Sequence, residues 1–395
     1  MARYSSIIGQ TLYNMKTSLR SLRPVGNPIK LRKEPLDYTQ FGNFHLDFYH
    51  SGTAALAASI SAIKSLWLNE DASPEIILPA YACPDLISAI LYAGATPVLV
   101  DLEPDSCWMS LEQIEQRITK LTIAIIAVRF LGIAERMQQL HELCKKYQLT
   151  LIEDSAQGFP LTRPDNYWLG DVIILSFGRG KPVNMLGGGA VLTKIDAIKD
   201  NLPASSSHAD TFSEQLIYII KVQIYNYVIN PAVYGITHKL PGFNIGETIF
   251  KPLNQLSGIH DSITERLNFN IKYFKKLPNR LLDIKNKIEL LKSMKIVNLP
   301  SVTQHDFENP LLRYPILVKN QEIRDALHEK LTPLGSSIMY QKPLYQIKGV
   351  PAVPNRGQTA YINAESFADR LITLPTHKDV SNRILEEIFA RLREV

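Results

Sequence analysis

Short apolar runs alternate with helical patterns between residues 76 and 193, and this alternation limits the folds that the chain can adopt. Strands that alternate with helices pair into a mainly parallel sheet with right-handed crossovers. We therefore predict an α/β protein whose large domain contains such a sheet. The predicted strands are 76–78, 97–100, 123–128, 149–152, 172–175 and 190–193, and the predicted helices are 84–93, 111–118 and 134–147.

A chain of 395 residues is long enough for this large domain and a smaller one. After a helical pattern at 255–295, short strands at 312–318 and 371–374 alternate with helices at 321–331 and 382–393, which indicates a small C-terminal α/β domain. The predicted division is a basic N-terminal arm at 1–45, a large domain at 46–255 with an apolar insertion at about 201–250, and the small domain at 256–395.

Charge and cysteine content narrow the class of protein. The net charge of +5 is too small to indicate nucleic-acid binding. Cys83, Cys107 and Cys144 are widely spaced and odd in number, so they form neither a metal-ligand pattern nor a disulfide framework. We expect no metal site and a reducing compartment. No apolar run is long enough to span a bilayer and no secretory signal is present, so we expect a cytoplasmic protein.

Two segments leave a choice between protein and membrane contact. Residues 1–33 carry seven Lys or Arg residues, no acidic residue, and apolar residues at helical spacing. We interpret them as an arm packed on the protein's own dimer, with an anionic membrane surface as the alternative. The apolar stretch 216–229 is interpreted as a buried or dimer-facing helix, again with a membrane-surface element as the alternative.

Polar residues follow two predicted strands at the points where they end. Asp154 comes after 149–152, and Ser176 begins a loop after 172–175 that contains Lys181. Neighbouring parallel strands lie about 4.8 Å apart, and their ends share the edge at which α/β proteins bind ligands. A Schiff-base lysine opposite an aspartate is the arrangement that pyridoxal phosphate requires. The sequence therefore predicts a pyridoxal phosphate site at this edge.

A phosphate site is predicted where Ser51, Gly52, Thr53 and Ala54 open a helical pattern that runs to about Leu68. The N–H groups and positive dipole of a helix N-terminus bind phosphate, although these residues taken alone also fit an ordinary helix cap. Ser176, Thr53 and the N–H groups after Ser51 would then hold the cofactor phosphate.

The remaining predicted roles concern the ring of the cofactor. Asp154 would favour the protonated ring nitrogen, because a nearby carboxylate stabilises a positive charge. Gln157, three residues further on, would hydrogen-bond the ring hydroxyl. Lys181 would form the linkage to the cofactor and then move a proton between substrate and cofactor carbons, which is general acid–base catalysis.

Six ordered motifs resemble those of the DegT/StrS-type aminotransferases, and the likeness runs from about residue 40 to the C-terminus. This resemblance implies a pyridoxal-phosphate enzyme with the fold of aspartate aminotransferase (fold type I). It also implies a homodimer with shared active sites that transfers an amino group from glutamate to the keto group of a nucleotide-linked sugar. The motifs are Ser51-Gly52-Thr53-Ala54-Ala55-Leu56, Leu78-Pro79-Ala80-Tyr81, Ala93-Gly94-Ala95-Thr96-Pro97-Val98, Glu153-Asp154-Ser155-Ala156-Gln157, Gly170-Asp171 and Ser176-Phe177 with Lys181.

The resemblance assigns the same roles to Lys181, Asp154, Gln157, Ser176 and Thr53 as the residue patterns do. In addition, Asn244 resembles the asparagine that reaches the phosphate in the neighbouring subunit, although Gly246 stands where the family has an arginine. Another departure is Cys83, which occupies the position of an aromatic residue that stacks on the cofactor ring. Either Tyr81 takes over the stacking or a smaller group covers the ring.

A third departure is Gly187, which replaces an acidic residue in a glycine-rich loop. Because these departures surround the substrate rather than the cofactor, they indicate an unusual acceptor such as a lipid-linked sugar. Two other functions remain open. Dehydration of a sugar is disfavoured by Lys181, because the sugar dehydratases of the family have a histidine there. A non-catalytic regulatory or structural dimer is favoured by Cys83 and disfavoured by the intact pair of Asp154 and Lys181.

Overall fold

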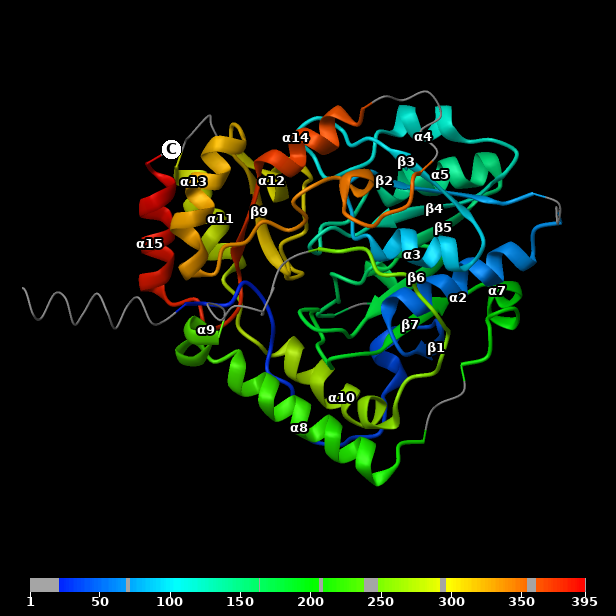
Figure 1. The fold of residues 1–395 in the computed structure, drawn as a ribbon, viewed down its shortest axis with the longest axis horizontal. Coiled ribbons are helices and arrows are strands. Elements are labelled where there is room, and N and C mark those ends of the chain that lie inside the picture. The colour runs from blue at the N-terminus through cyan, green and yellow to red at the C-terminus, as the bar shows by residue number, and fades with distance from the viewer. Residues whose placement is uncertain are drawn as a thin grey trace, which may run out of the picture.

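The computed structural model describes residues 21–68, 72–162, 164–205, 209–237, 248–291, 296–353 and 360–394. Their strands form two sheets, one of seven strands and one of three. Figure 1 shows the large sheet with helices on both sides and the three-stranded sheet beside it, close to the C-terminus. Among the described helices, none has the length and hydropathy needed to cross a membrane.

The large sheet has the strand order β1-β7-β6-β5-β4-β2-β3. The four pairings from β6 to β3 are parallel, and β7 runs antiparallel to both β6 and β1. The prediction of a mainly parallel sheet is thus confirmed, although β1 was not predicted as a strand. The strands are β1 His45–Tyr49, β2 Glu75–Pro79, β3 Thr96–Val100, β4 Thr122–Val128, β5 Thr150–Asp154, β6 Val172–Ser176 and β7 Gly189–Thr193.

Helices cover both faces of this sheet, which explains why its central strands are apolar at nearly every position. Successive side chains of a strand point to opposite faces. Ile76 accordingly packs in one core cluster with α2 (Gly52–Ser65) and α3 (Asp85–Tyr92), whereas Ile77 packs in another with α4 (Leu111–Arg117) and α5 (Met137–Tyr147). The short helices α6 (Pro164–Tyr167) and α7 (Asp196–Asp200) complete the large body.

The smaller sheet is antiparallel, in the order β10-β9-β8, and its helices share a core cluster with α2 and α3. Its strands are β8 Val297–Asn298, β9 Arg313–Leu317 and β10 Leu371–Pro375, and its helices are α11 Leu281–Leu290, α12 Leu299–Val302, α13 Gln321–Leu331, α14 Ile362–Arg370 and α15 Asn382–Leu392. The predicted strands and helices of a small C-terminal α/β domain are therefore present, and one continuous apolar core joins that domain to the large sheet.

The helical pattern predicted at 255–295 is in fact two helices, α10 (Asp261–Lys275) and α11, because a turn that contains Pro278 separates them. Ile263, Leu267 and Ile271 of α10 pack with apolar residues of β6 and β7. Although α10 follows the predicted boundary at 255/256, its packing places it with the large sheet.

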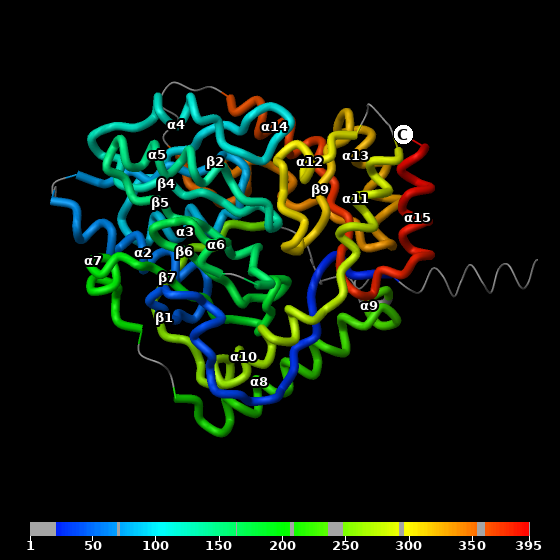
Figure 2. Tube along the Cα trace, turned by 180° about the vertical axis from the view of Figure 1, so that it is seen from behind, coloured from blue at the N-terminus to red at the C-terminus, as the bar shows by residue number. Residues whose placement is uncertain are grey.

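Helix α8 (Phe212–Val228) lies along the edge of the molecule beside α10 in both Figure 1 and Figure 2, and α9 (Pro231–Thr237) follows it. Val222 is the one buried residue of α8, whereas Phe212, Ile224 and Tyr227 are more than half exposed. For 216–229 we predicted a buried or dimer-facing helix. One face of α8 has no covering element among the described residues, so the helix is not fully buried within the single chain, and the dimer-facing and membrane-surface interpretations both stay predictions.

The N-terminal segment that the structure describes packs on its own chain. Leu22 and Ile29 are buried, and the Arg23 guanidinium donates to the Ile229 carbonyl oxygen (2.9 Å) and pairs with Asp379 (2.6 Å). The predicted arm is therefore partly integrated into the chain itself. Residues 1–20 of that arm lie outside the described residues.

Candidate active site

The carboxyl ends of β5 and β6 meet at a pocket, as the sequence predicts for adjacent parallel strands. Asp154 at the end of β5 is the register partner of Ile174, and Ser176 ends β6. The residues that line the pocket are Gly52, Thr53, Leu56, Cys83, Asp85, Leu86, Asp154, Ala156, Gln157, Ile174, Ser176 and Lys181. Seven predicted site residues are thus brought together, namely Gly52, Thr53, Cys83, Asp154, Gln157, Ser176 and Lys181.

A tight turn returns Lys181 to the pocket after β6 ends. The Lys181 amide donates to the Gly178 carbonyl oxygen (3.2 Å), and Gly180 has a φ of +79°, a conformation that favours glycine. The Met185 amide then donates to the Phe177 carbonyl oxygen (2.7 Å), which closes the loop. The loop thereby holds the lysine beside the strand end from which it started.

The two consecutive acids Glu153 and Asp154 point in opposite directions because they lie on one strand. Glu153 forms a buried ion pair with Arg129 (2.6 Å) and accepts hydrogen bonds from the amides of Leu169 and Gly170. Asp154 faces the pocket, where its Oδ1 accepts a hydrogen bond from the Ala156 amide (3.0 Å). Of these two acids, Asp154 is therefore the one available to a ligand in the pocket.

The pKa of Asp154 is raised, and burial is the main cause. The positive charge of Lys181 acts in the opposite direction and favours the ionised carboxylate. A ligand that places a second positive charge beside Asp154 would therefore stabilise its ionised form. The protonated nitrogen of a pyridine ring is such a group.

The N-terminus of α2 approaches the end of β6 closely. A β-carbon on Gly52 would lie 2.7 Å from the Ser176 β-carbon, so only glycine permits this approach. The side chain of the N-cap residue Ser51 accepts a hydrogen bond from the Ala54 amide (3.1 Å). The Ala54 N–H therefore already has a partner within the protein. The positive end of the helix thus faces the pocket beside the hydroxyls of Thr53 and Ser176, which is a suitable environment for a phosphate group.

Cys83, rather than Tyr81, lines the pocket at the position where the resemblance implies an aromatic residue. Tyr81 is buried behind it, and its hydroxyl donates to the Tyr340 carbonyl oxygen (2.9 Å) and accepts from the Tyr340 amide (3.1 Å). Its ring also packs edge-on against Phe367. Burial raises the pKa of the Cys83 thiol to about 12, so this group is neutral at physiological pH.

Gln157 lines the pocket but is also held by the protein. Its Oε1 accepts a hydrogen bond from the Leu131 amide (2.8 Å), and its Nε2 donates to the Tyr340 hydroxyl (3.1 Å). One N–H of the side-chain amide remains for a ligand, because an amide nitrogen carries two hydrogens. Asn244, the last of the predicted site residues, lies outside the described residues.

The sequence analysis did not identify two residues at the site, Asp85 and Tyr340. Asp85 begins α3 and lines the pocket, and its acidic character at the first turn of a predicted helix was the available signal. Tyr340 belongs to the C-terminal part of the chain and reaches the site through Gln157. No local pattern marks Tyr340, because only the tertiary fold brings it there.

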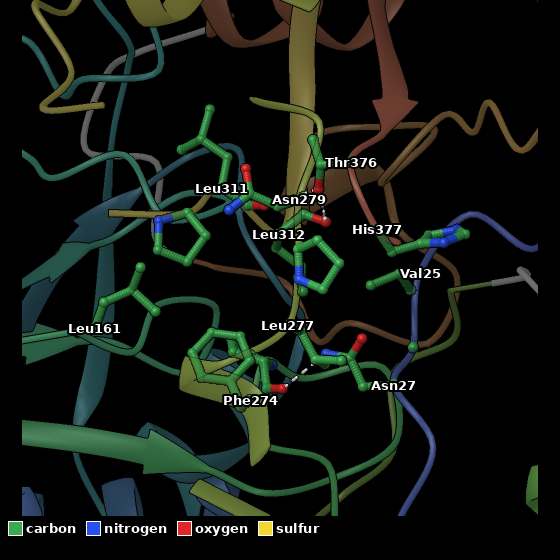
Figure 3. A pocket seen from close by; sticks show the side chains of 14 residues that line it. Val25, Asn27, Leu161, Phe274, Leu277, Asn279, Leu311, Leu312, Thr376 and His377 are labelled. Atoms are coloured by element: carbon green, nitrogen blue, oxygen red, sulfur yellow. Dashed lines mark hydrogen bonds between the residues drawn. The ribbon is translucent and has the colours of Figure 1, made fainter. Parts of the chain in front are cut away.

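A second pocket lies beside the Lys181 loop, and Figure 3 shows it between the N-terminal segment and the small domain. Asn27, Pro182, Leu311 and His377 contribute to its wall. The Asn27 side chain donates to the Pro182 carbonyl oxygen (3.2 Å), which ties the N-terminal segment to the residue directly after Lys181. The described N-terminal segment thus supports the lysine loop.

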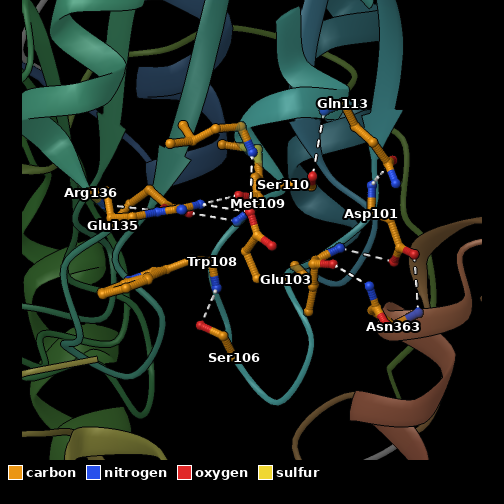
Figure 4. A network of polar contacts seen from close by, with 12 residues as sticks. Asp101, Glu103, Ser106, Trp108, Met109, Ser110, Gln113, Glu135, Arg136 and Asn363 are labelled. Atoms are coloured by element: carbon orange, nitrogen blue, oxygen red, sulfur yellow. Dashed lines mark hydrogen bonds and ion pairs between the residues drawn. The ribbon is translucent and has the colours of Figure 1, made fainter. Parts of the chain in front are cut away.

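A polar network holds α14 against the large sheet (Figure 4). Asp101, which follows β3, accepts hydrogen bonds from the amides of Asn363 (3.0 Å) and Ala364 (2.8 Å) in the first turn of α14. A carboxylate at a helix N-terminus also interacts favourably with the helix dipole. Because α14 carries Phe367, this network supports the aromatic cluster behind Cys83.

The same network includes a buried glutamate. Glu135 accepts hydrogen bonds from the amides of Met109 (2.8 Å) and Arg136 (2.9 Å). Burial raises the pKa of its carboxyl group to about 7, although these hydrogen bonds act in the opposite direction. The ionisation of Glu135 should therefore influence stability near neutral pH.

The fold and this site define a fold type I pyridoxal-phosphate enzyme. The profile of the DegT/DnrJ/EryC1/StrS aminotransferase family matches residues 41–230 and 277–393, and the chain belongs to that family.

Relatives and solved structures give a consistent result. The chain is 32% identical to GDP-perosamine synthase of Vibrio cholerae over 168 residues, which are 41% of this chain and 44% of that protein. It is 26% identical to dTDP-4-amino-4,6-dideoxy-D-glucose transaminase of Shigella dysenteriae over 93% of this chain and 89% of that protein. The crystal structure of NtdA from Bacillus subtilis with bound cofactor PMP has a TM-score of 0.65 at 20% identity and covers 89% and 73% of the two chains.

Proposed function

We propose that this protein is a pyridoxal-phosphate-dependent aminotransferase that moves an amino group from an amino acid, glutamate in the first instance, to the keto group of a nucleotide-linked sugar. The observation that carries this proposal is the single pocket that contains Lys181, Asp154 and the N-terminus of α2. The names of the relatives from Vibrio cholerae and Shigella dysenteriae support a sugar acceptor.

The residues of the pocket fit the cofactor at both of its charged ends. Thr53, Ser176 and the first turn of α2 would hold the phosphate, where the close approach of Gly52 to Ser176 leaves no room for a side chain. Asp154 would accept a hydrogen bond from the ring nitrogen and keep that nitrogen protonated. Gln157 would donate its remaining N–H to the ring hydroxyl.

Pyridoxal phosphate, when bound, supplies an aldehyde carbon and a ring that withdraws electrons. The chain supplies the base, because Lys181 lines the pocket and would move a proton between the substrate carbon and the cofactor carbon. Asp154 is buried and Cys83 is half-buried, which limits water in this part of the pocket. Cys83 would cover one face of the ring with a small neutral thiol in place of an aromatic side chain.

The proposal includes a homodimer in which Asn244 reaches the phosphate in the partner's site. The apolar face of α8 supports an assembly of this kind, because Phe212, Ile224 and Tyr227 remain exposed in the single chain. The cytoplasm is the proposed location. A lipid-linked acceptor is a variant of the same proposal, since an apolar surface beside the active-site body would suit a lipid.

The decisive test is the absorption spectrum of the purified protein with bound cofactor. We expect a visible band that L-glutamate converts to a band in the near ultraviolet, and a Lys181→Ala protein without a linkage that borohydride can fix. Lys221→Ala is the matched control, because Lys221 lies exposed on α8, far along the chain from the pocket. A spectrum that no amino donor changes would favour a non-catalytic cofactor-binding protein.

A further inference from the structure

Arg313, the first residue of β9, is a positive side chain without a described counter-ion. Its Nε is sealed from solvent and has no hydrogen-bond partner. The residue as a whole is partly exposed, so a ligand can reach it. In the described part of the chain no carboxylate pairs with its guanidinium. A guanidinium N–H that is removed from water without a partner is unfavourable, so the buried Nε of Arg313 requires an explanation.

The immediate neighbours of Arg313 do not neutralise it. Its charge interacts most strongly with Tyr340, and then with Tyr234 and Tyr81. Burial raises the pKa of all three phenols, so each is uncharged at neutral pH. Burial also lowers the pKa of Arg313 to about 10, which leaves the guanidinium positive at neutral pH. None of these three neighbours therefore neutralises the charge of Arg313.

Two relations in the fold place Arg313 near the active site. The amide of Leu312, the residue before Arg313, donates to the Leu131 carbonyl oxygen (2.8 Å), and the Leu131 amide donates to Gln157, which lines the pocket with Lys181. Leu312 also lines the second pocket together with Pro182, the residue directly after Lys181. Arg313 therefore follows a residue that connects to both Gln157 and the lysine loop.

The geometry points to Arg313 as the residue that binds the carboxylate of the amino-acid donor, an inference that depends on the function proposed above. An arginine offers a planar pair of N–H groups that matches the two oxygens of a carboxylate. A single, partly enclosed guanidinium near the pocket suits a small anion such as the carboxylate of an amino acid. A nucleoside diphosphate carries more charge and bulk, and it would need several cations in an open groove.

The inference is tested by titrating the holoenzyme with glutarate, an unreactive dicarboxylate, and separately with dTDP. We expect Arg313→Met to weaken glutarate binding by about 10- to 100-fold, the effect of losing a hydrogen-bonded charge pair. Arg313→Lys should give an intermediate loss, since it keeps the charge and loses the planar fork. The affinity for dTDP should not change in either variant.

Thermal unfolding separates this role from a structural one. Removal of an uncompensated charge should leave the Tm of Arg313→Met equal to or above that of the wild type. Arg324 provides the matched control, because it is a buried arginine of the same domain whose guanidinium donates to the Ala368 carbonyl oxygen (2.6 Å) and to Asp325 (2.8 Å). Arg324→Met should lower the Tm and leave glutarate affinity intact.

Three results would overturn the inference. They are equal glutarate affinity in wild type and Arg313→Met, a loss confined to dTDP, and a wild-type holoenzyme that does not bind glutarate. The function proposed above can fail independently. A holoenzyme that binds glutarate through Arg313 but does not change its spectrum with any amino donor would support the anion site and contradict the transfer reaction.

Discussion

Gly52, the first residue of α2, and Ser176, the last residue of β6, lie so close together that a methyl group does not fit between them. A β-carbon on Gly52 would come within 2.7 Å of the Ser176 β-carbon and 3.0 Å of its Oγ. This contact aligns a serine hydroxyl with the N-terminus of a helix. The Ser176 hydroxyl and the N–H groups at the start of α2 can therefore bind the same phosphate group.

Gly52→Ala should weaken binding of pyridoxal phosphate by about tenfold or more, because the new methyl group displaces Ser176 from the helix N-terminus, and loss of one charge-assisted hydrogen bond has about this effect. Fluorescence titration of the apoenzyme with the cofactor measures the change. Gly187→Ala is the control, since its added β-carbon would meet ordinary contacts of 3.5 Å or more. Equal cofactor affinity in the two variants would contradict this account of the phosphate site.

Asp154→Asn should lower kcat by about 10²-fold or more, because the ring nitrogen loses the negative charge that keeps it protonated. The stability of the apoenzyme should change little, since burial already raises the pKa of Asp154 and disfavours its charge. Steady-state rates and thermal unfolding measure the two effects.

Glu153→Gln is the control for Asp154→Asn, because it changes the neighbouring acid on the opposite face of the same strand. It breaks the buried pair with Arg129 and should cost about 3 kcal/mol of stability while the catalytic rate is largely retained. If the Glu153 variant lost activity without losing stability, the assignment of the two acids to opposite faces would be wrong.

The buried carboxyl of Glu135 predicts a pH dependence of stability. Its pKa is about 7 in the folded chain against 4.5 in the unfolded one. Because the pKa is raised in the folded chain, protonated Glu135 favours folding. This contribution to the free energy of unfolding is complete below about pH 4.5 and is lost as the pH rises through 7. Glu135→Gln mimics the protonated form, so the Tm of the variant should rise relative to wild type between pH 5 and pH 8.

The corresponding change in unfolding free energy is on the order of 3 kcal/mol for a shift of this size. Gln has one hydrogen-bond acceptor fewer than a carboxylate at every pH, and this loss changes the Tm by a constant amount. The informative quantity is therefore the change, between pH 5 and pH 8, in the Tm difference between variant and wild type. A difference in Tm between variant and wild type that stays constant across this range would show that Glu135 does not titrate in the folded protein.

The exposed apolar face of α8 predicts an assembly that one charge can disrupt. Ile224 is 58% exposed, so Ile224→Glu should leave the fold of the single chain unchanged. If a second copy covers this face, light scattering after size-exclusion chromatography should show a dimer for the wild type and a monomer for the variant. A dimer in both proteins, together with loss of binding to anionic vesicles in the variant, would instead favour a membrane surface.

The sequence predicted those parts of the site that local patterns determine. Asp154 and Ser176 each end an apolar run, and chain order made neighbouring parallel strands the simplest topology, which the pairing of β5 with β6 confirms. The direction of a side chain at the end of a strand was harder to predict. Glu153 and Asp154 were treated as one motif, although the alternation of a strand sends them to opposite faces.

Contacts between distant parts of the chain were not predictable from local patterns. Tyr340 reaches Gln157 across 183 positions of sequence, and Tyr81 pairs with it instead of facing the pocket. Arg313 lies within an apolar strand, where a single charge carries no signal until its missing partner is seen. The break between α10 and α11 was missed because one helical pattern was assigned across 255–295, although Pro278 lies between the two helices.

The two hydrogen bonds between Tyr81 and Tyr340 and the attachment of α14 to Asp101 bear on how a bulky sugar could come and go. Opening the molecule by swinging its smaller sheet away would break all four bonds at once and expose aromatic rings to water. A sugar should therefore enter and leave the pocket while the two sheets stay joined, and product departure should not require the smaller sheet to move.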